Sequence, residues 1–366
     1  MKGDGVHQQL HPHAFQVCGP RNVASPNWKD LISSSWKDGN YKRIAIACFI
    51  QAVYLLELDR QESRTAQQAL APNWWLPFKY KLTSTLIDHR DCSIFGAVFE
   101  WDRSAGMIPP VRPSGAPRAV LALRGTLLKS HTFRRDIQDD LRFLAWETLE
   151  GSVRFQQALE ELRRLALSYG SCNVCVAGHS LGAGFALQVG RALAHQGIFV
   201  ETHLFNPPSL SIAMALKDVG EKVDSAWNRL KAILHLSSDT SPDTSHSQPA
   251  AKVPNSAWNW VPSFYGNKIP DGAALKSWVP HLYVNNSDYI CCYYNDAAGS
   301  GGDTQSAGTS GTKSRVAAKL FVPTKGKQKF AEAHGLEQWW SDDLELQMFV
   351  NNSKLIRMQL QPLLTK

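Results

Sequence analysis

The sequence of 366 residues has little that resembles a targeting or membrane-spanning segment, and we expect neither a secretory signal nor a transmembrane helix. Its first 20 residues, MKGDGVHQQLHPHAFQVCGP, contain no apolar stretch like the centre of a secretory signal. The longest apolar run, residues 44–58 (IAIACFIQAVYLLEL), is too short to span a bilayer and is interrupted by Gln51. We therefore expect an intracellular, cytoplasmic protein in which residues 44–58 form part of a buried helix.

The sequence has few cysteines and no pattern of metal ligands. The sequence contains seven cysteines, an odd number, and shows no secretion signal. We therefore expect the cysteines to be reduced thiols. Cys172 and Cys175 form a C-x-x-C pair with no second pair at zinc spacing. We favour structural cysteines, with zinc binding or redox chemistry as alternatives. Three N-terminal histidines lack acidic partners and are interpreted as tail composition: His7, His11 and His13. We expect no metal and no cofactor.

The sequence also lacks a dense basic run with interleaved aromatic residues, which is typical of nucleic-acid binding. Its net charge of +7 comes from 39 Lys and Arg against 32 Asp and Glu, scattered along the chain. This distribution predicts a solvated surface and no nucleic-acid partner. Peripheral contact with an anionic membrane or lipid surface stays open.

The hydrophobic content of 43% is enough for a large core, in one α/β domain or two smaller domains. We expect a disordered tail (1–27) followed by a single α/β domain (28–366). Three parts of that domain are distinguished by composition: an N-terminal helical part (28–90), a Trp-rich insertion (237–280) and a disordered, glycine-rich loop (296–314).

Strand and helix patterns alternate along the chain. The pattern from residue 28 to about residue 86 is helical, including residues 41–60. Strands are predicted at 93–101, 118–126, 173–178, 199–208, 317–323 and within 280–294, and helices at 151–170, 181–197 and 226–236. This alternation predicts a mostly parallel central sheet with helices on both faces.

A G-x-S-x-G motif at Gly178, Ser180 and Gly182 lies between a predicted strand and a predicted helix. At average glycine usage such a match arises by chance in roughly one chain in ten of this length. The strand before the serine and the helix after it make the match stronger. Side chains at the two glycine positions would collide with neighbouring backbone in the sharp turn. A small serine in an ordinary strand-to-helix turn is the alternative.

The turn would also leave backbone N–H groups free to stabilise an oxyanion. We assign one donor to the N–H of Leu181. The second should come from the loop after an earlier strand, where VLALRGT offers the N–H of Thr126, with its hydroxyl as a further donor.

A nucleophilic serine needs a base and an acid, in the chain order Ser, then Asp or Glu, then His. Six histidines follow Ser180: His195, His203, His235, His246, His281 and His334. Of these, only His334 follows Asp288, the acid that we favour. His179 is adjacent to the serine, and neighbouring side chains point apart, so we expect it to be a packed neighbour and not the base.

Asp288 directly follows an apolar strand, where an orienting acid belongs. Asp239 and Asp243 are alternatives in a polar stretch that reads as a mobile loop, and Asp296 is a weaker one. An Asx-turn role for Asp288 and a structural role for His334 are the remaining alternatives.

These features resemble a known family. With ALRGT, AGHSLGAGFA, YVNNSDYI and the late histidine in this order, the sequence resembles the class 3 (fungal-type) lipases of the α/β-hydrolase superfamily, and looks closest to a plant branch of intracellular lipase-like proteins. The resemblance covers roughly residues 93–345. It implies an α/β-hydrolase fold, here with an N-terminal helical extension, and a Ser180–Asp288–His334 triad that cleaves acyl esters of lipids through an acyl-enzyme.

The chain departs from the family pattern in three places. Ala183 replaces a second glycine after the elbow, and the Trp-rich insertion lengthens the gap from Ser180 to Asp288. A lid is not evident, although residues 133–147 fall in the lid-bearing region. Four aromatic residues offer a lipid-facing surface, with buried packing the favoured alternative: Trp258, Trp260, Phe264 and Tyr265.

The resemblance leaves two other functions open. Lipase-like folds also serve plants as non-catalytic scaffolds that bind a ligand or partner in signalling. Acyl transfer to an acceptor other than water would use the same triad. We expect a serine ester hydrolase whose partner is an acyl-ester or lipid substrate.

Overall fold

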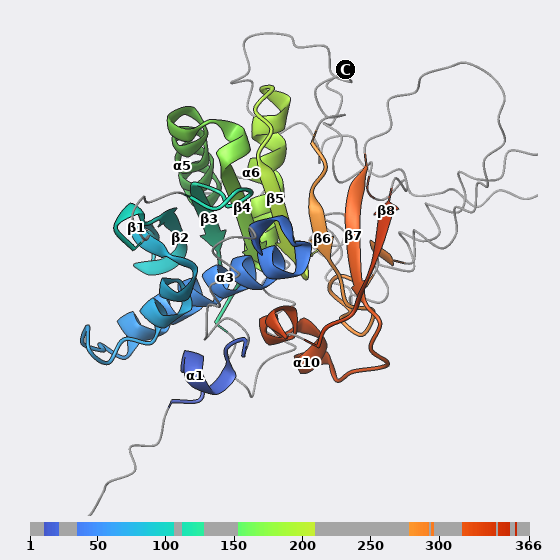
Figure 1. The fold of residues 1–366 in the computed structure, drawn as a ribbon, viewed down its shortest axis with the longest axis horizontal. Coiled ribbons are helices and arrows are strands. Elements are labelled where there is room, and N and C mark those ends of the chain that lie inside the picture. The colour runs from blue at the N-terminus through green and yellow to red at the C-terminus, as the bar shows by residue number, and fades with distance from the viewer. Residues whose placement is uncertain are drawn as a thin grey trace, which may run out of the picture.

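The computed structural model describes residues 11–21, 35–105, 112–127, 153–208, 278–292, 294–295, 317–341, 343–351 and 356. These residues form an eight-stranded mixed sheet in which the strands lie side by side in chain order (Figure 1). The strands are β1 (Tyr80–Asp88), β2 (Ser93–Trp101), β3 (Ala119–Leu123), β4 (Val174–His179), β5 (Glu201–Phe205), β6 (His281–Tyr283), β7 (Ala318–Pro323) and β8 (Leu346–Asn351).

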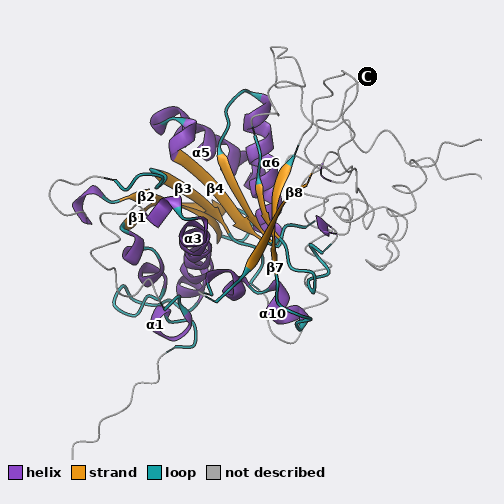
Figure 2. Cartoon of the chain, turned by 45° about the vertical axis from the view of Figure 1, so that its right-hand side comes forward, coloured by secondary structure: helices purple, strands orange, loops and turns teal. Residues whose placement is uncertain are grey.

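The central strands β3 to β7 are parallel, and the pairs at the two edges are antiparallel. Helices cover both faces of the sheet: α3 (Gly39–Gln61) lies on one face, and α5 (Val153–Tyr169) and α6 (Leu181–His195) lie on the other (Figure 2). The expected α/β fold with a mostly parallel sheet is confirmed.

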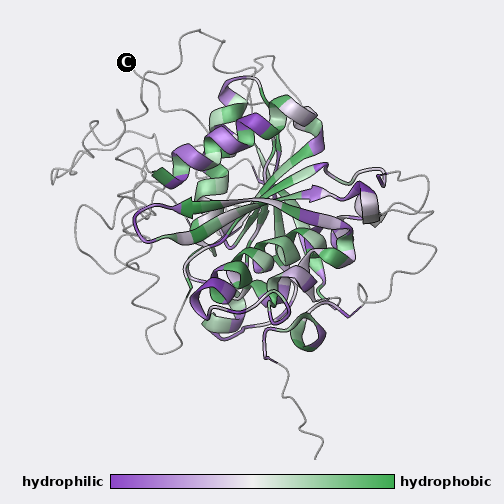
Figure 3. Cartoon of the chain, turned by 90° about the vertical axis from the view of Figure 1, so that its left-hand side faces the viewer, coloured by the Kyte–Doolittle hydropathy of each residue, from purple (hydrophilic) through white to green (hydrophobic). Residues whose placement is uncertain are grey.

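Each face of the sheet has its own apolar core. On the α5–α6 face, Leu121, Val176 and Leu204 pack against the two helices. On the α3 face, Val120, Ala177 and their neighbours pack against α3 and the aromatic residues that follow it. Because β3 and β4 are covered on both faces, every residue in them is buried, as is usual for parallel strands. Apolar residues accordingly concentrate in the sheet and on the helices around it (Figure 3).

Local sequence explains the ends of the flanking helices. Asp38 caps α3, because its side chain accepts a hydrogen bond of 2.9 Å from the N–H of Asn40. Helix α5 buries Ala158, Leu162 and Leu165 on one side, as its periodicity predicts. It ends at Tyr169 and is followed by Gly170, whose φ of 81° favours glycine.

Two predictions near the N-terminus are wrong. The helical pattern was extended to about residue 86, but residues 80–88 form strand β1, which pairs antiparallel with β2. The disordered tail was extended to residue 27, but residues 11–21 are ordered and Phe15–Cys18 forms α1. Phe15 packs edge-on against Trp74 with ring centroids 5.2 Å apart, and this distant contact holds the segment in place.

Several predicted features lie outside the described residues. They are the helix at 226–236, the lid region at 133–147, most of the Trp-rich insertion and the loop at 296–314. Trp278, at the end of the insertion, is described and is 2% exposed, with its indole N–H donating to the carbonyl of Val200. Among the described helices, none has the length and apolarity that crossing a membrane requires.

Candidate active site

Ser180 lies in a sharp turn between β4 and α6. Its φ of 54° and ψ of −125° fall in a backbone region that non-glycine residues rarely adopt. Both glycines of the motif are needed, since a Cβ on Gly178 would lie 2.2 Å from the carbonyl oxygen of Gly182. A Cβ on Gly182 would lie 2.5 Å from the carbonyl oxygen of Leu123. The expected collisions with backbone at these two positions are confirmed.

The serine turn is held at both ends by hydrogen bonds. The N–H of Ser180 donates to the carbonyl of Phe205 at the end of β5, at 2.9 Å. Its carbonyl accepts from the N–H of Ala183 and of Gly184 in the first turn of α6. A strained serine persists because neighbouring elements hold its backbone from both sides.

The RGT turn that follows β3 lies directly beside the serine. A Cβ on Gly125 would be 3.0 Å from Cβ of Ser180, so the turn approaches the serine as closely as a glycine permits. Thr126, next in the chain, is partly exposed, and Leu181 begins α6 and is buried. The two residues that we assigned as oxyanion donors therefore flank Ser180 on adjoining turns.

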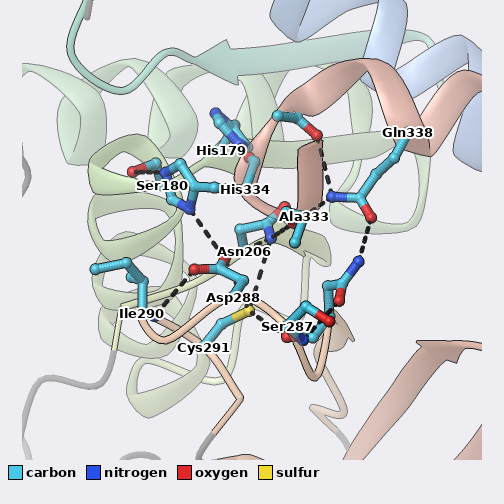
Figure 4. A network of polar contacts seen from close by, with 12 residues as sticks. His179, Ser180, Asn206, Ser287, Asp288, Ile290, Cys291, Ala333, His334 and Gln338 are labelled. Atoms are coloured by element: carbon cyan, nitrogen blue, oxygen red, sulfur yellow. Dashed lines mark hydrogen bonds and ion pairs between the residues drawn. The ribbon is translucent and has the colours of Figure 1, made fainter. Parts of the chain in front are cut away.

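The structure brings Ser180, His334 and Asp288 together (Figure 4). Nε2 of His334 lies 3.0 Å from Oγ of Ser180, and Nδ1 of His334 lies 2.9 Å from Oδ2 of Asp288. His334 is the last residue of the short helix α10 (Phe330–His334), and Asp288 lies in the loop after β6. Both side chains are buried, whereas Ser180 is partly exposed.

The Asp288 carboxylate accepts hydrogen bonds from four groups. Oδ1 accepts from the N–H of Ile290 at 2.9 Å. Oδ2 accepts from His334, from the amide of Asn206 at 2.6 Å and from the thiol of Cys291 at 3.1 Å. Burial raises the pKa of the Cys291 thiol well above its ordinary value, so the thiol keeps its proton as a donor. These donors allow a fully buried carboxylate to remain beside His334.

Asn206 is a site residue that the sequence analysis missed. It follows β5 with φ of 48° and is completely buried. Its amide nitrogen donates to Asp288 and to the carbonyl of Ala333, and its oxygen accepts from the indole N–H of Trp339. Asn206 thus connects the acid to the backbone just before His334. The position of Asn206 at the end of a predicted strand, in the sequence FNPP, could have indicated a site residue.

His179 is a packed neighbour, as expected, but it has a defined contact with the site. Its Nε2 lies 2.8 Å from the carbonyl oxygen of His334, and its Nδ1 lies 2.9 Å from the hydroxyl of Tyr54 on α3. Burial, together with the nearby His334, lowers the pKa of His179 to about 3, so the ring is neutral.

The alternatives to Asp288 lie outside the described residues: Asp239, Asp243 and Asp296. Of the other histidines after Ser180, His195, His203 and His281 are described, and the ring of His203 is bonded to Tyr283 and Glu201. His235 and His246 are outside the described residues, as are Trp258, Trp260, Phe264 and Tyr265.

One side-chain group in the described part of the chain could hold a metal ion: Glu201, His203 and His281. Lys42 of α3 contacts the group, which places it on the α3 face of the sheet. The ammonium of Lys42 already contacts both carboxylate oxygens of Glu201, at 3.0 and 3.1 Å. His203 is likewise bonded at both ring nitrogens, to Glu201 and to Tyr283. Glu201 and His203 therefore already have hydrogen-bond partners within the protein.

Comparison with known proteins finds two sequence matches. Residues 123–217 match the family model described as lipase (class 3), a segment that contains Thr126, Ser180 and Leu181. A protein of Arabidopsis thaliana named a GDSL esterase/lipase is 29% identical over 355 residues, which cover 90% of this chain and 95% of that protein. No solved structure matches the chain with statistical significance. The resemblance to class 3 lipases is confirmed, and both matches support an ester hydrolase.

Proposed function

We propose that the protein hydrolyses acyl esters of lipids, with Ser180 as the nucleophile, His334 as the general base and Asp288 as the orienting acid. The observation that carries the proposal is that the imidazole of His334 contacts the serine hydroxyl with one nitrogen and the buried carboxylate with the other. A serine hydroxyl becomes an effective nucleophile when a positioned base takes its proton.

The hydrogen-bond directions suit this chemistry. Nδ1 of His334 donates to Asp288, so Nε2 carries the lone pair that accepts the proton of Ser180. Oγ attacks the ester carbonyl carbon while its proton moves to Nε2. The tetrahedral intermediate collapses when His334 protonates the leaving alcohol, which leaves an acyl group on Ser180. Water then attacks the acyl-enzyme by the same steps, with His334 again as the base.

The oxyanion of each tetrahedral intermediate needs donors that are already in position. In our proposal the N–H groups of Leu181 and Thr126 supply them. The closeness of Gly125 to Ser180 supports this assignment, because Thr126 follows Gly125 directly. The start of α6 adds the partial positive charge of a helix N-terminus near Leu181.

The test compares hydrolysis of p-nitrophenyl esters of several chain lengths by the wild type, Ser180→Ala and His334→Ala. Ser104→Ala, which replaces an exposed serine, is the control. We expect each triad variant to lose about 10⁴-fold in kcat or more, with Ser104→Ala unchanged. A wild type that neither hydrolyses any of these esters nor reacts with a fluorophosphonate would contradict the proposal and favour a ligand-binding scaffold.

A further inference from the structure

Tyr54 joins two parts of the candidate active site that are far apart in sequence. It lies on α3, and its hydroxyl oxygen is 2.8 Å from the backbone nitrogen of Gly125 and 2.9 Å from Nδ1 of His179. The other nitrogen of His179 is 2.8 Å from the carbonyl oxygen of His334. A continuous chain of hydrogen bonds therefore runs from the RGT turn to the backbone of His334.

The donor and the acceptor of each of these three hydrogen bonds can be assigned. A carbonyl oxygen only accepts, so Nε2 of His179 must carry the hydrogen that goes to His334. The ring is neutral, because burial lowers the pKa of His179 to about 3. Its Nδ1 then has only a lone pair, to which Tyr54 donates. The remaining lone pairs of the Tyr54 oxygen accept the N–H of Gly125.

The RGT turn is anchored on both sides of Gly125. Tyr54 holds its N–H, and the guanidinium of Arg124 donates to its carbonyl at 2.7 Å. The carbonyl of Gly125 and the N–H of Thr126 belong to one planar trans peptide, in which the two groups point in opposite directions. Fixing that carbonyl therefore also fixes the direction of the Thr126 N–H.

Helix α3 braces the same turn at a second point. Glu57, one helical turn after Tyr54, accepts the N–H of Ile94 at 2.8 Å. The carbonyl of Ile94 in turn accepts from Nε of Arg124 at 2.6 Å. One face of α3 thus contacts Gly125 directly through Tyr54 and supports Arg124 indirectly through Glu57 and Ile94. Helix α3 lies outside residues 123–217, the segment that matches the lipase family model.

We infer that Tyr54 is a positioning residue for the reaction proposed above: its hydroxyl joins the N–H of Gly125 to His179, which is itself bonded to the carbonyl of His334, and so fixes the Thr126 turn relative to the backbone of His334. The inference rests on the proposed function for its catalytic consequence. Its structural part, the hydrogen bonds of His179, can be measured without any activity. Tyr54 contributes by orienting other groups and takes no proton from the substrate.

The chain offers a matched control for the loss of one buried tyrosine–histidine hydrogen bond. The hydroxyl of Tyr283 lies 3.0 Å from Nδ1 of His203, on the same face of the sheet and with no hydrogen bond to the triad. Tyr54→Phe and Tyr283→Phe each remove one hydroxyl and keep the ring. A merely structural role predicts similar behaviour of the two variants.

The experiment measures kcat and KM on a soluble p-nitrophenyl ester, together with the ¹⁵N signals of the histidine imidazoles. For Tyr54→Phe we expect kcat to fall about 10- to 100-fold with KM within about twofold, since small displacements of catalytic groups cost rate more than binding. For Tyr283→Phe we expect kcat within about twofold of the wild type. The His179 signals should show the Nε2–H tautomer in both proteins, with the Nδ1 signal shifted in Tyr54→Phe because its hydrogen-bond donor is lost.

The two readouts separate this inference from the proposed function. A wild type without esterase or fluorophosphonate reactivity would overturn the proposed function, and the imidazole signals would still decide the hydrogen-bond chain. An Nδ1–H tautomer of His179 in the wild type would overturn the inference. So would equal losses of kcat in Tyr54→Phe and Tyr283→Phe, or an unchanged kcat in Tyr54→Phe.

Discussion

Nε2 of His334 lies 3.0 Å from Oγ of Ser180, although the two residues are 154 positions apart. The order of the strands produces this contact. Ser180 follows β4, and Asp288 and His334 follow β6 and β7 in the same sheet. Because these strands are parallel, the segments that follow them leave the sheet at the same edge.

The first prediction concerns the acid. Asp288→Asn places an amide where a carboxylate now accepts the N–H of His334. An amide can present its own N–H to Nδ1 and so favour the wrong tautomer of His334. We expect kcat to fall about 10⁴-fold, with little change in KM.

Steady-state kinetics of Asp288→Asn, Asp239→Asn and Asp243→Asn check this prediction. The last two should keep nearly full activity. Activity that survives in Asp288→Asn and collapses in Asp239→Asn or Asp243→Asn would identify a different acid.

The second prediction concerns Asn206, whose amide donates to Asp288 at 2.6 Å. Asn206→Asp keeps the shape and the tolerance for positive φ but puts a second buried carboxyl beside the first. Like charges at this distance raise the pKa of one carboxyl, so the penalty is full above that raised pKa and is relieved as pH falls. We expect a loss of about 3 kcal/mol in unfolding free energy at pH 8.

Urea unfolding at pH 8 and pH 6 measures the effect of Asn206→Asp. Asn295→Asp is the control, because Asn295 makes an exposed contact with Asn286. It should change stability by less than about 0.5 kcal/mol. Equal stabilities of the two variants at pH 8 would show that Asn206 does not support Asp288.

The third prediction concerns the serine turn. In Gly178→Ala the new Cβ would meet the backbone of Gly182 at 2.2 Å, and backbone cannot move aside as a flexible side chain can. We expect a lower melting temperature and loss of reactivity at Ser180. Gly39→Ala, where nothing lies within 4 Å of the new Cβ, is the control and should be neutral or stabilising by up to about 1 kcal/mol. A Gly178→Ala protein as stable and active as Gly39→Ala would contradict the described turn.

The fourth prediction concerns pH and His281. Burial, together with the neighbouring His203, lowers the pKa of His281 from an ordinary value of 6.5 to about 3. In the unfolded chain His281 therefore binds a proton below about pH 6.5, whereas in the folded chain it stays neutral down to about pH 3. The unfolding free energy must fall as pH drops through that interval.

Urea unfolding at pH 7 and pH 5 tests this prediction with the wild type and His281→Asn. The stability lost between the two pH values should be smaller in His281→Asn, by about 1 kcal/mol. Equal losses in the two proteins would show that His281 takes up its proton without cost to the fold.

Local sequence patterns were enough to predict the serine turn and most of the sheet. The glycines around Ser180, the strand before it and the helix after it are neighbours in the chain, so the spacing alone indicates the turn. Strand β1 was missed because the aromatic residues before it extended a helical pattern. Tyr80, Leu82 and Leu86 fall on one side of a two-residue period, and this was the signal for a strand.

The support around the triad could not be read from local patterns. Asn206, Tyr54 and His179 contact the site through hydrogen bonds that span between 82 and 155 positions. Each of these residue types is common at strand ends and in helices, and only the packing of α3 and α10 against the sheet gives them their partners. The same holds for α1, which is ordered by contacts with Trp74 and Trp340.

The central claim is that Ser180 is an activated nucleophile, and covalent labelling tests it most directly. The wild type, Ser180→Ala and His334→Ala are treated with a fluorophosphonate, and the adduct is located by mass spectrometry of peptides. We expect one adduct per chain, on Ser180, absent from Ser180→Ala and strongly reduced in His334→Ala. No adduct on the wild type, an adduct on another residue, or equal labelling of His334→Ala would contradict the claim.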